Sequence, residues 1–466
     1  MQPMIESPTR RDVLQSIGAG FGMVGLAGVL GTAATPGSGF AGAANSSPLA
    51  VKPGHLPAKA KRVIFLFMNG GPSHVDTFDP KPMLTKYDGS APPDSEAGRK
   101  KMKLMKSPFT FKKYGKAGIE VSDLFPNIAR QIDDICVIRS MVTDSPAHER
   151  ALLFMNSGNM QPIRPSMGSW LTYGLGTENQ NLPGFMVLCP GKPVVGPQLW
   201  GNSFLPAVFQ GTHINNANIN PKTLIRHLEN PALNLSVQRD QLDLLQAFNQ
   251  IHLDQRANDS TLESRIQSLE IAYRMQAEAM DGFDLAKEPE RIRRMYGPGE
   301  FANACLLARR LTERGVRMVQ IYYGNGQPWD DHGDILNHRK HAEKSDQAVG
   351  ALLADLKARG LLDETLVIWG GEFGRTPASQ GAKGRDHHSR GFTMWLAGGG
   401  IKGGMVHGAT DELGIDSVQD RVHVHDLHAT ILHLMGLDHE RLTFRYSGRD
   451  FRLTDVHGHV VQEILA

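Results

Sequence analysis

Carboxylate and imidazole side chains gather in four short segments of this 466-residue sequence. One of them, Trp329–Asp334, carries Asp330 and His332 directly after an apolar run and a Gly-Asn-Gly loop. Hard oxygen and borderline nitrogen donors on a stiff support are what a divalent metal ion binds. We therefore expect Asp330 and His332 to be metal ligands, with a solvated acidic loop as the alternative. His338 and His341, one helical turn apart, are expected to be surface residues of a helix.

A second segment, Gly370–Pro377, places an acid and an arginine just after a predicted strand. The two glycines before Glu372 let the backbone come close to another group. Glu372 is a candidate metal ligand, and Arg375 is a candidate for binding two oxygens of an anion with its planar fork. The alternative is a Glu–Arg pair that only stabilises the turn.

The third segment, Gly384–Arg390, holds two adjacent histidines that no amphipathic pattern explains. We expect His387 to bind a metal and Asp386 to orient its ring, because ligating histidines usually have such a partner. A purely structural role for the pair is the alternative.

The fourth segment, Ser145–Arg150, precedes a predicted helix. Backbone N–H groups at a helix start attract anions, so Ser145, His148 and Arg150 are candidates for catalysis. A plain capping role for Ser145 is the alternative.

The elements that must position these segments follow an α/β order. Continuous apolar runs predict strands buried on both faces, at residues 62–69, 135–139, 185–188, 317–323, 365–369 and 392–397. Helical periodicity is present at residues 238–280, 300–314, 340–359 and 424–435. The last four strands are expected to alternate with helices as right-handed βαβ units. Ligands of open α/β sheets bind at the carboxyl ends of the strands, which is where the polar segments lie.

The composition excludes several classes of protein. With 50 Lys+Arg against 48 Asp+Glu the net charge is +2, which argues against a nucleic-acid-binding protein. Charged residues make up 21% and apolar residues 40%, as in ordinary globular chains. Three scattered cysteines are too few for a disulfide scaffold or a thiolate zinc site.

The N-terminal segment is predicted to be an export signal. Arg10 and Arg11 precede a Gly-rich, mildly apolar stretch, and Ala41–Ala43 supplies small residues for cleavage, as in a twin-arginine export signal over residues 1–44. An N-terminal anchor helix is the alternative. No later segment reaches ~18 uninterrupted apolar residues, so we expect no stable membrane span in the mature chain. The twin-arginine machinery would deliver it to the periplasm or the extracellular space.

The expected organisation after the signal is a linker at residues 45–60 and one domain at residues 61–455. Segments near 77–125 and 190–235 are rich in Pro, Gly, Asn and Lys and are expected to be insertions. Residues 456–466 form a C-terminal tail.

The order of these segments resembles the alkaline phosphatase/arylsulfatase superfamily, and more closely a twin-arginine-exported, sulfatase-like branch of it. The phrases that carry the resemblance are residues 70–82, 329–332, 371–377, 384–387, 397–404 and 426–434. The resemblance covers about residues 60–450. It implies an α/β fold, an α/β/α sandwich around a large mixed, mostly parallel sheet.

The same resemblance implies a site. Asp330 and His332 correspond to the superfamily's metal pair, although their spacing departs from it, and Glu372 and His387 correspond to later ligands. The ligand of the first strand falls at Asn69, so either Asp76 substitutes for it or Asn69 is a weaker ligand. The nucleophile segment of sulfatases aligns only loosely with residues 145–158, which hold no Cys, so no formylglycine is expected.

The resulting hypothesis is an exported, metal-dependent hydrolase of phosphate or sulfate esters, acting on a small-molecule or glycan ester. One or two divalent ions (Zn, Ca, Mg or Mn) would polarise the ester, and Arg150 and Arg375 would neutralise its oxygens. The nucleophile would be Ser145, His148 or a metal-bound water. The alternatives are a non-catalytic anion- or glycan-binding protein and a structural cell-envelope protein.

Overall fold

The computed structural model of this chain describes residues 47–93, 102–220, 224, 233–255, 270–271, 273–276, 278 and 281–466. The chain divides into two units, Met1–Ser46 and Ser47–Ala466, and only the second lies within these ranges. The predicted export signal lies outside the described residues. Parts of the two predicted insertions and of the helix predicted at residues 238–280 also lie outside them.

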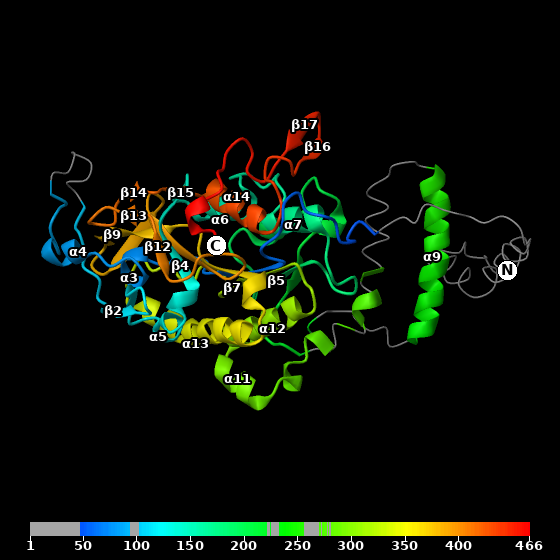
Figure 1. Cartoon of the computed structure of the whole chain (residues 1–466), viewed down its shortest axis with the longest axis horizontal. Helices are drawn as coiled ribbons and strands as arrows, with labels where there is room; N and C mark the ends of the chain where they lie inside the picture. The colour runs from blue at the N-terminus through cyan, green and yellow to red at the C-terminus, as the bar shows by residue number, and fades with distance from the viewer. Residues whose placement is uncertain are drawn as a thin grey trace, which may run out of the picture. The chain divides into compact units, whose positions relative to one another are not determined.

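A nine-stranded mixed sheet forms the centre of the second unit (Figure 1). Its order is β12-β4-β11-β8-β1-β7-β5-β6, with β15 also paired to β4, and only β11 runs antiparallel to its neighbours. The strands are β1 (Arg62–Phe67), β4 (Ile135–Val142), β5 (Phe185–Leu188), β6 (Thr212–Ile214), β7 (Met318–Tyr322), β8 (Thr365–Gly370), β11 (Phe392–Ala397), β12 (Met405–His407) and β15 (Val422–His423). All six predicted strands belong to this sheet.

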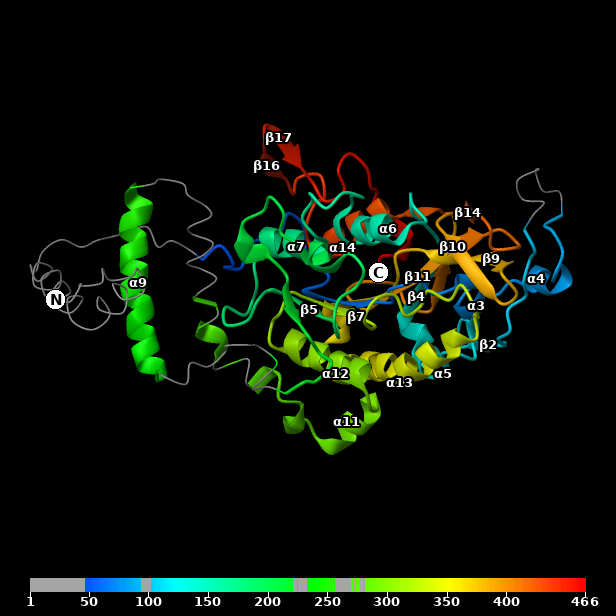
Figure 2. The ribbon, with the colours of Figure 1, turned by 180° about the vertical axis from the view of Figure 1, so that it is seen from behind.

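Helices cover both faces of the sheet (Figure 2). One apolar core joins the sheet to α5, α12 and α13, and a second core joins it to α6, α7 and α14. The helices are α3 (His74–Thr77), α4 (Pro82–Lys86), α5 (Pro126–Ala129), α6 (His148–Ser157), α7 (Met167–Leu175), α9 (Leu235–Gln255), α11 (Glu290–Tyr296), α12 (Glu300–Glu313), α13 (Asn337–Ala358) and α14 (Val424–Leu434). The predicted α/β/α sandwich around a mostly parallel sheet is confirmed.

Smaller strand pairs lie outside the central sheet. They are β2 (Phe111–Tyr114) with β3 (Ile119–Ser122), β9 (Gly374–Gln380) with β10 (Gly384–His388), β13 (Ala409–Thr410) with β14 (Ser417–Gln419), and β16 (Phe444–Tyr446) with β17 (Arg449–Phe451). Within the described ranges, no helix combines the length and apolar character that crossing a bilayer requires.

The connection from β8 to β11 corrects the expected alternation of strands and helices. The residues between these strands pair with one another as the hairpin β9–β10 instead of forming a crossover helix. A parallel neighbour needs such a crossover, so the chain returns as an antiparallel strand beside β8. The crossover from β7 through α13 to β8 does follow the expected βαβ pattern, and both strands flank β1 in parallel.

The segment at residues 190–235, expected to be a surface insertion, also contributes to the sheet. Its strand β6 pairs in parallel with β5 at the edge of the sheet. This strand has only three residues, too short for an apolar run to announce it in the sequence.

Candidate metal centre

Three adjacent parallel strands deliver the polar loops to one edge of the sheet. β1 lies between β7 and β8, and the loops after these strands carry Gly70, Asp330 and Glu372. Gly70 has φ 110°, and a Cβ there would lie 2.6 Å from the backbone nitrogen of Asp330. A Cβ at Gly384 would likewise overlap the His332 carbonyl. These glycines let the loops pack backbone to backbone, which fixes Asp330 and His332.

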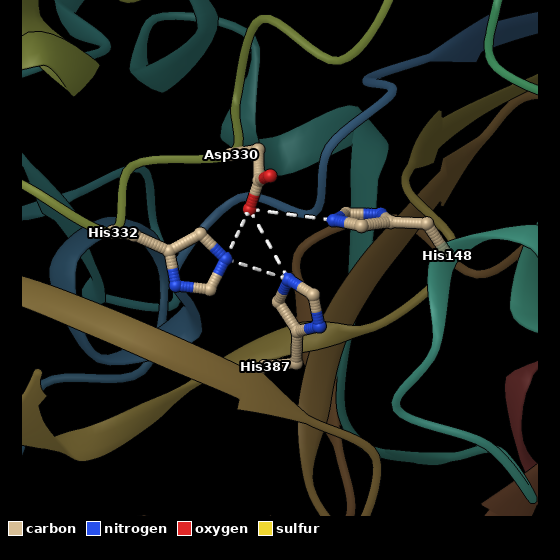
Figure 3. Close-up of side chains that lie close together, drawn as sticks. All are labelled: His148, Asp330, His332 and His387. Carbon is tan, nitrogen blue, oxygen red and sulfur yellow. Dashed lines mark hydrogen bonds and ion pairs between the residues drawn. The ribbon is translucent and has the colours of Figure 1, made fainter.

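Four side chains converge at this edge (Figure 3). His148, Asp330, His332 and His387 each bring one ligand atom to within 4.8 Å of the others, the one such group of His, Cys, Asp and Glu among the described residues. Oδ1 of Asp330 lies 3.3 Å from Nε2 of His148, 2.8 Å from Nε2 of His332 and 3.2 Å from Nε2 of His387. Three nitrogens and one oxygen therefore surround a common point.

Each imidazole is held from behind by a hydrogen-bond acceptor at its other nitrogen. Nδ1 of His148 lies 2.7 Å from Oε1 of Glu372, and Nδ1 of His387 lies 2.7 Å from the Pro146 carbonyl. Nδ1 of His332 contacts Oε1 of Gln380. Each acceptor can receive a hydrogen bond from Nδ1–H. A neutral imidazole with its proton on Nδ1 has a free lone pair on Nε2, and this lone pair can bind a metal ion, as in metal-bound histidines.

The charges in the cluster favour a cation. Burial alone would raise the pKa of Asp330, but hydrogen bonds from His148 and His387 and the charge of Arg375 hold this pKa well below its usual range. Burial opposes protonation of His148, yet its contacts with Asp330 and Glu372 raise its pKa to about 9. A metal ion would take the place of the proton that His148 otherwise holds.

Glu372 lies behind His148 and not among the four converging side chains. Its carboxylate is fully buried, accepts from the Gly70 N–H at 3.0 Å and contacts His148. The expectation that Glu372 is a ligand is therefore corrected, because its carboxylate is outside the converging group and contacts Nδ1 of His148 instead. It orients His148, a residue that the sequence had suggested only as a catalytic group.

Arg375 also has a different place from the one expected. Its side chain is fully buried, and Nη2 lies 2.6 Å from Oδ1 of Asp330 while Nε donates to the Gly71 carbonyl at 3.0 Å. Because its guanidinium is hydrogen-bonded to groups of this chain, Arg375 positions Asp330 and is not available to a substrate anion. Arg150, by contrast, is exposed in the first turn of α6.

Asp76 does not reach the cluster. It is fully buried and forms a two-pronged ion pair with Arg385, with distances of 2.6 and 3.2 Å. Its expected ligand role is therefore corrected. Asn69 is also fully buried, and its Nδ2 donates to the carbonyls of Gly324 and Gly326, while its Oδ1 has no hydrogen-bond partner in the described part of the chain. A ligand role for Asn69 stays a prediction.

Ser145 is buried, and its Oγ accepts from the Ala147 N–H at 3.2 Å. The N-cap of α6 is Ala147, so the alternative reading of Ser145 as the cap of this helix is wrong. The role of Ser145 as a nucleophile stays a prediction.

Four supporting groups were missed or misplaced by the sequence patterns. His338 is completely buried, not on the surface; its Nδ1 lies 2.6 Å from Asp331, and its Nε2 accepts from the Ser73 N–H. Gln380 and the Pro146 carbonyl had no signal in the sequence. Asp386, the expected partner of His387, accepts from that residue's backbone N–H instead of its ring.

The position of Glu372 leads to a prediction. Glu372→Gln keeps the size of the side chain but removes the charge that holds the Nδ1 proton of His148. We expect metal affinity to fall ~10-fold, at the lower end of what losing such a partner costs. Titration of the metal-free protein with Zn²⁺ or Mn²⁺ measures it. Glu364→Gln, in the turn just before β8, is the matched control and should leave metal affinity unchanged, because this partly exposed carboxylate pairs with Lys61. Unchanged affinity in Glu372→Gln would contradict the orienting role.

A family model described as "Protein of unknown function (DUF1501)" matches residues 60–465. No curated protein matches the sequence.

Solved structures with a similar chain path include three from named bacteria. One is a protein in the alkaline phosphatase superfamily from Vibrio parahaemolyticus (11% identity, 89% of this chain and 73% of that chain, TM-score 0.36). Another is the PsFucS1 sulfatase from Pseudoalteromonas sp. (12% identity, 81% and 68%, TM-score 0.34). A third is the lipoteichoic acid synthase LtaP from Listeria monocytogenes (9% identity, 87% and 78%, TM-score 0.36).

Proposed function

We propose that this chain, which belongs to the family described as protein of unknown function (DUF1501), is a metal-dependent hydrolase of phosphate or sulfate esters. The observation that carries the proposal is the convergence of three imidazole Nε2 atoms on one Asp330 oxygen. The ester class comes from the sequence phrases that resemble the alkaline phosphatase/arylsulfatase superfamily.

The ligand atoms limit which metal ions the site would bind. Ca²⁺ and Mg²⁺ prefer oxygen ligands, whereas imidazole suits transition metals. Among the four ions expected from the sequence we therefore favour Zn²⁺ or Mn²⁺. Such an ion supplies a Lewis acid for the ester oxygen and lowers the pKa of water.

The side chains around the ligands have supporting roles. Glu372 fixes the tautomer of His148, and Arg375 holds the carboxylate of Asp330 in place. Arg150, exposed two residues after His148, is the arginine left to meet a substrate anion. Ser145, three residues before His148, is the candidate nucleophilic hydroxyl, and it is buried.

The experiment measures metal content and turnover together. Protein purified without chelator is analysed for bound metals and assayed with p-nitrophenyl phosphate, bis(p-nitrophenyl) phosphate and p-nitrophenyl sulfate. We expect about one ion per chain, and turnover that a chelator removes and Zn²⁺ or Mn²⁺ restores. The absence of bound metal, together with no response to added metal, would refute the proposal.

A second function is favoured by one specific observation. Four protein ligands fill all positions of a tetrahedral ion, the arrangement of structural zinc sites, and Arg375 is spent on Asp330. The alternative is therefore a non-catalytic protein that binds anions or glycans. Binding without turnover, measured for the metal-loaded protein across phosphate esters and sulfated glycans, would favour it.

We also propose export through the twin-arginine pathway to the periplasm or beyond. The support is the pair Arg10-Arg11 before an apolar, Gly-rich stretch. Replacing both arginines by lysine keeps the charge, so retention of the precursor in the cytoplasm would show that the pair is read as a signal. Unchanged export would count against it.

A further inference from the structure

A separate hollow of about 410 Å³ lies between three segments that are far apart in the sequence. They are the loop after α6 at residues 162–164, the loop at residues 203–204, and the hairpin β16–β17. None of its lining residues belongs to the candidate metal centre. The hollow is of the size that small ligands occupy.

Aromatic rings form the apolar wall of this hollow. The ring of Phe204 stacks on that of Tyr446, with centroids 5.1 Å apart and planes 17° apart, and lies 4.9 Å from the ring of Phe451. Tyr446 is about half exposed, and Ile163 beside it is 59% exposed. A flat apolar surface is thus open to solvent next to the hollow, where a ring-shaped ligand gains contact area.

A partly buried and underpaired arginine forms the polar part of the lining. The side chain of Arg164 is only 12% exposed, and its guanidinium lies 4.2 Å from the centre of the Phe451 ring. Its single acidic contact is long, 3.5 Å from Nη2 to Oδ2 of Asp455. Nε and Nη1 are shielded from water, and no acceptor in the described part of the chain reaches them. Burial of a charge with so few partners costs free energy.

The local charge balance is positive. Asp455 is shared, because Arg449 also binds it through Oδ1 and lies over the same Phe451 ring at 4.9 Å. Two guanidinium groups therefore face one carboxylate, which leaves a net charge of about +1 beside an apolar wall. A ligand with one negative charge would balance it, whereas a cation would be repelled.

We propose that this hollow binds a monoanionic ring compound, with the carboxylate or sulfate group accepting hydrogen bonds from Arg164 and the ring lying against Phe204 and Tyr446. An acidic sugar and an aromatic acid share this chemistry. The guanidinium is a charged donor, and hydrogen bonds between such a donor and a carboxylate or sulfate are short and strong. A neutral ring would leave the Arg164 charge unpaired, and a ring-free anion would leave the aromatic wall bare.

The experiment measures binding to the full chain by calorimetry or ligand-observed NMR. The anionic probes are glucuronate, glucose 6-sulfate and benzoate, and their matched controls are glucose, benzyl alcohol and acetate. We expect the anionic rings to bind more tightly than all three controls. The class that binds best then identifies the source as sugar or aromatic acid.

Two variants locate the site. Arg164→Gln should weaken binding of the anionic rings ~10-fold or more, as loss of a charge-assisted hydrogen bond does. Arg445→Gln is the matched control, because this exposed arginine lies on the same hairpin but pairs with Asp450 instead of Asp455 and does not line the hollow. It should leave affinity within about twofold, on the scale of surface ion pairs.

A third variant covers the case in which Arg164→Gln does not fold, judged by thermal unfolding. Tyr446→Ala, on the exposed hairpin, should weaken the anionic rings without affecting acetate. Equal binding of neutral and anionic rings, no binding of any anionic ring at millimolar concentration, or unchanged affinity in folded Arg164→Gln would each overturn the proposal. Because binding needs neither metal nor turnover, the result is independent of the proposed hydrolase function.

Discussion

Replacing Asp330 by alanine should abolish stoichiometric metal binding and bring any metal-dependent hydrolysis down to the uncatalysed background. Its Oδ1 is the atom that lies 2.8–3.3 Å from Nε2 of His148, His332 and His387. It also supplies the negative charge beside the buried Arg375 guanidinium. Without it, three imidazoles and a positive charge would surround the incoming cation, so the loss should exceed the ~10–100-fold that removal of an orienting partner causes.

The measurement compares bound metal and turnover in Asp330→Ala with those in Asp386→Ala. Asp386 is a matched control because it is a carboxylate of the same cluster of loops, 3.9 Å from Nδ1 of His332, but its side chain is 58% exposed. We expect Asp386→Ala to keep its metal. Full metal content in folded Asp330→Ala would show that the four converging side chains are not a metal site.

The fold was largely predictable because its strands are buried on both faces. A strand such as β1, with nearly every side chain inside, reads as a continuous apolar run, and six such runs all became strands of one sheet. The reversal of β11 was not predictable in this way. Whether the chain after β8 forms a helix or the hairpin β9–β10 depends on pairing within that segment, and an apolar run gives no direction for the strand that follows.

The candidate site was predictable in part, because polar segments after parallel strands must meet at one edge. That rule brought together Asp330, His332 and His387. The rule could not distinguish a side chain whose ligand atom faces the common point from a side chain that contacts such a ligand from behind. Glu372 and His148 show the difference, since the sequence suggested the acid as the ligand and the structure exchanges their places.

The sequence likewise does not show how deeply an arginine side chain is buried. Arg375 and Arg385 both occur in polar, glycine-containing segments of the kind that bind anions, yet both side chains are completely buried. Each one is consumed by a carboxylate of this chain, Asp330 for Arg375 and Asp76 for Arg385. A sequence shows that an arginine is available for pairing, but only the packing shows whether its partner belongs to the protein or to a ligand.

Asp76→Ala should destabilise the protein strongly while leaving its metal content unchanged. Asp76 and Arg385 are both completely buried, and Arg385 also donates to the backbone of the loop at residues 105–106. Removing the carboxylate leaves a buried guanidinium without its counter-charge, which typically costs ~3–5 kcal/mol. Urea unfolding followed by fluorescence measures the loss, and metal analysis of the folded variant measures the site.

Two controls separate the buried ion pair from other effects. Asp450→Ala breaks the exposed pair with Arg445 on the hairpin β16–β17 and should change the free energy of unfolding by less than ~1 kcal/mol. The double variant Asp76→Ala with Arg385→Met removes both buried charges and should recover much of the loss, because an apolar side chain needs no partner. If Asp76→Ala were as stable as Asp450→Ala but lost its metal, Asp76 would belong with the ligands after all. Loss of stability with full metal content would instead establish that Asp76 supports the loops of the centre from within the core.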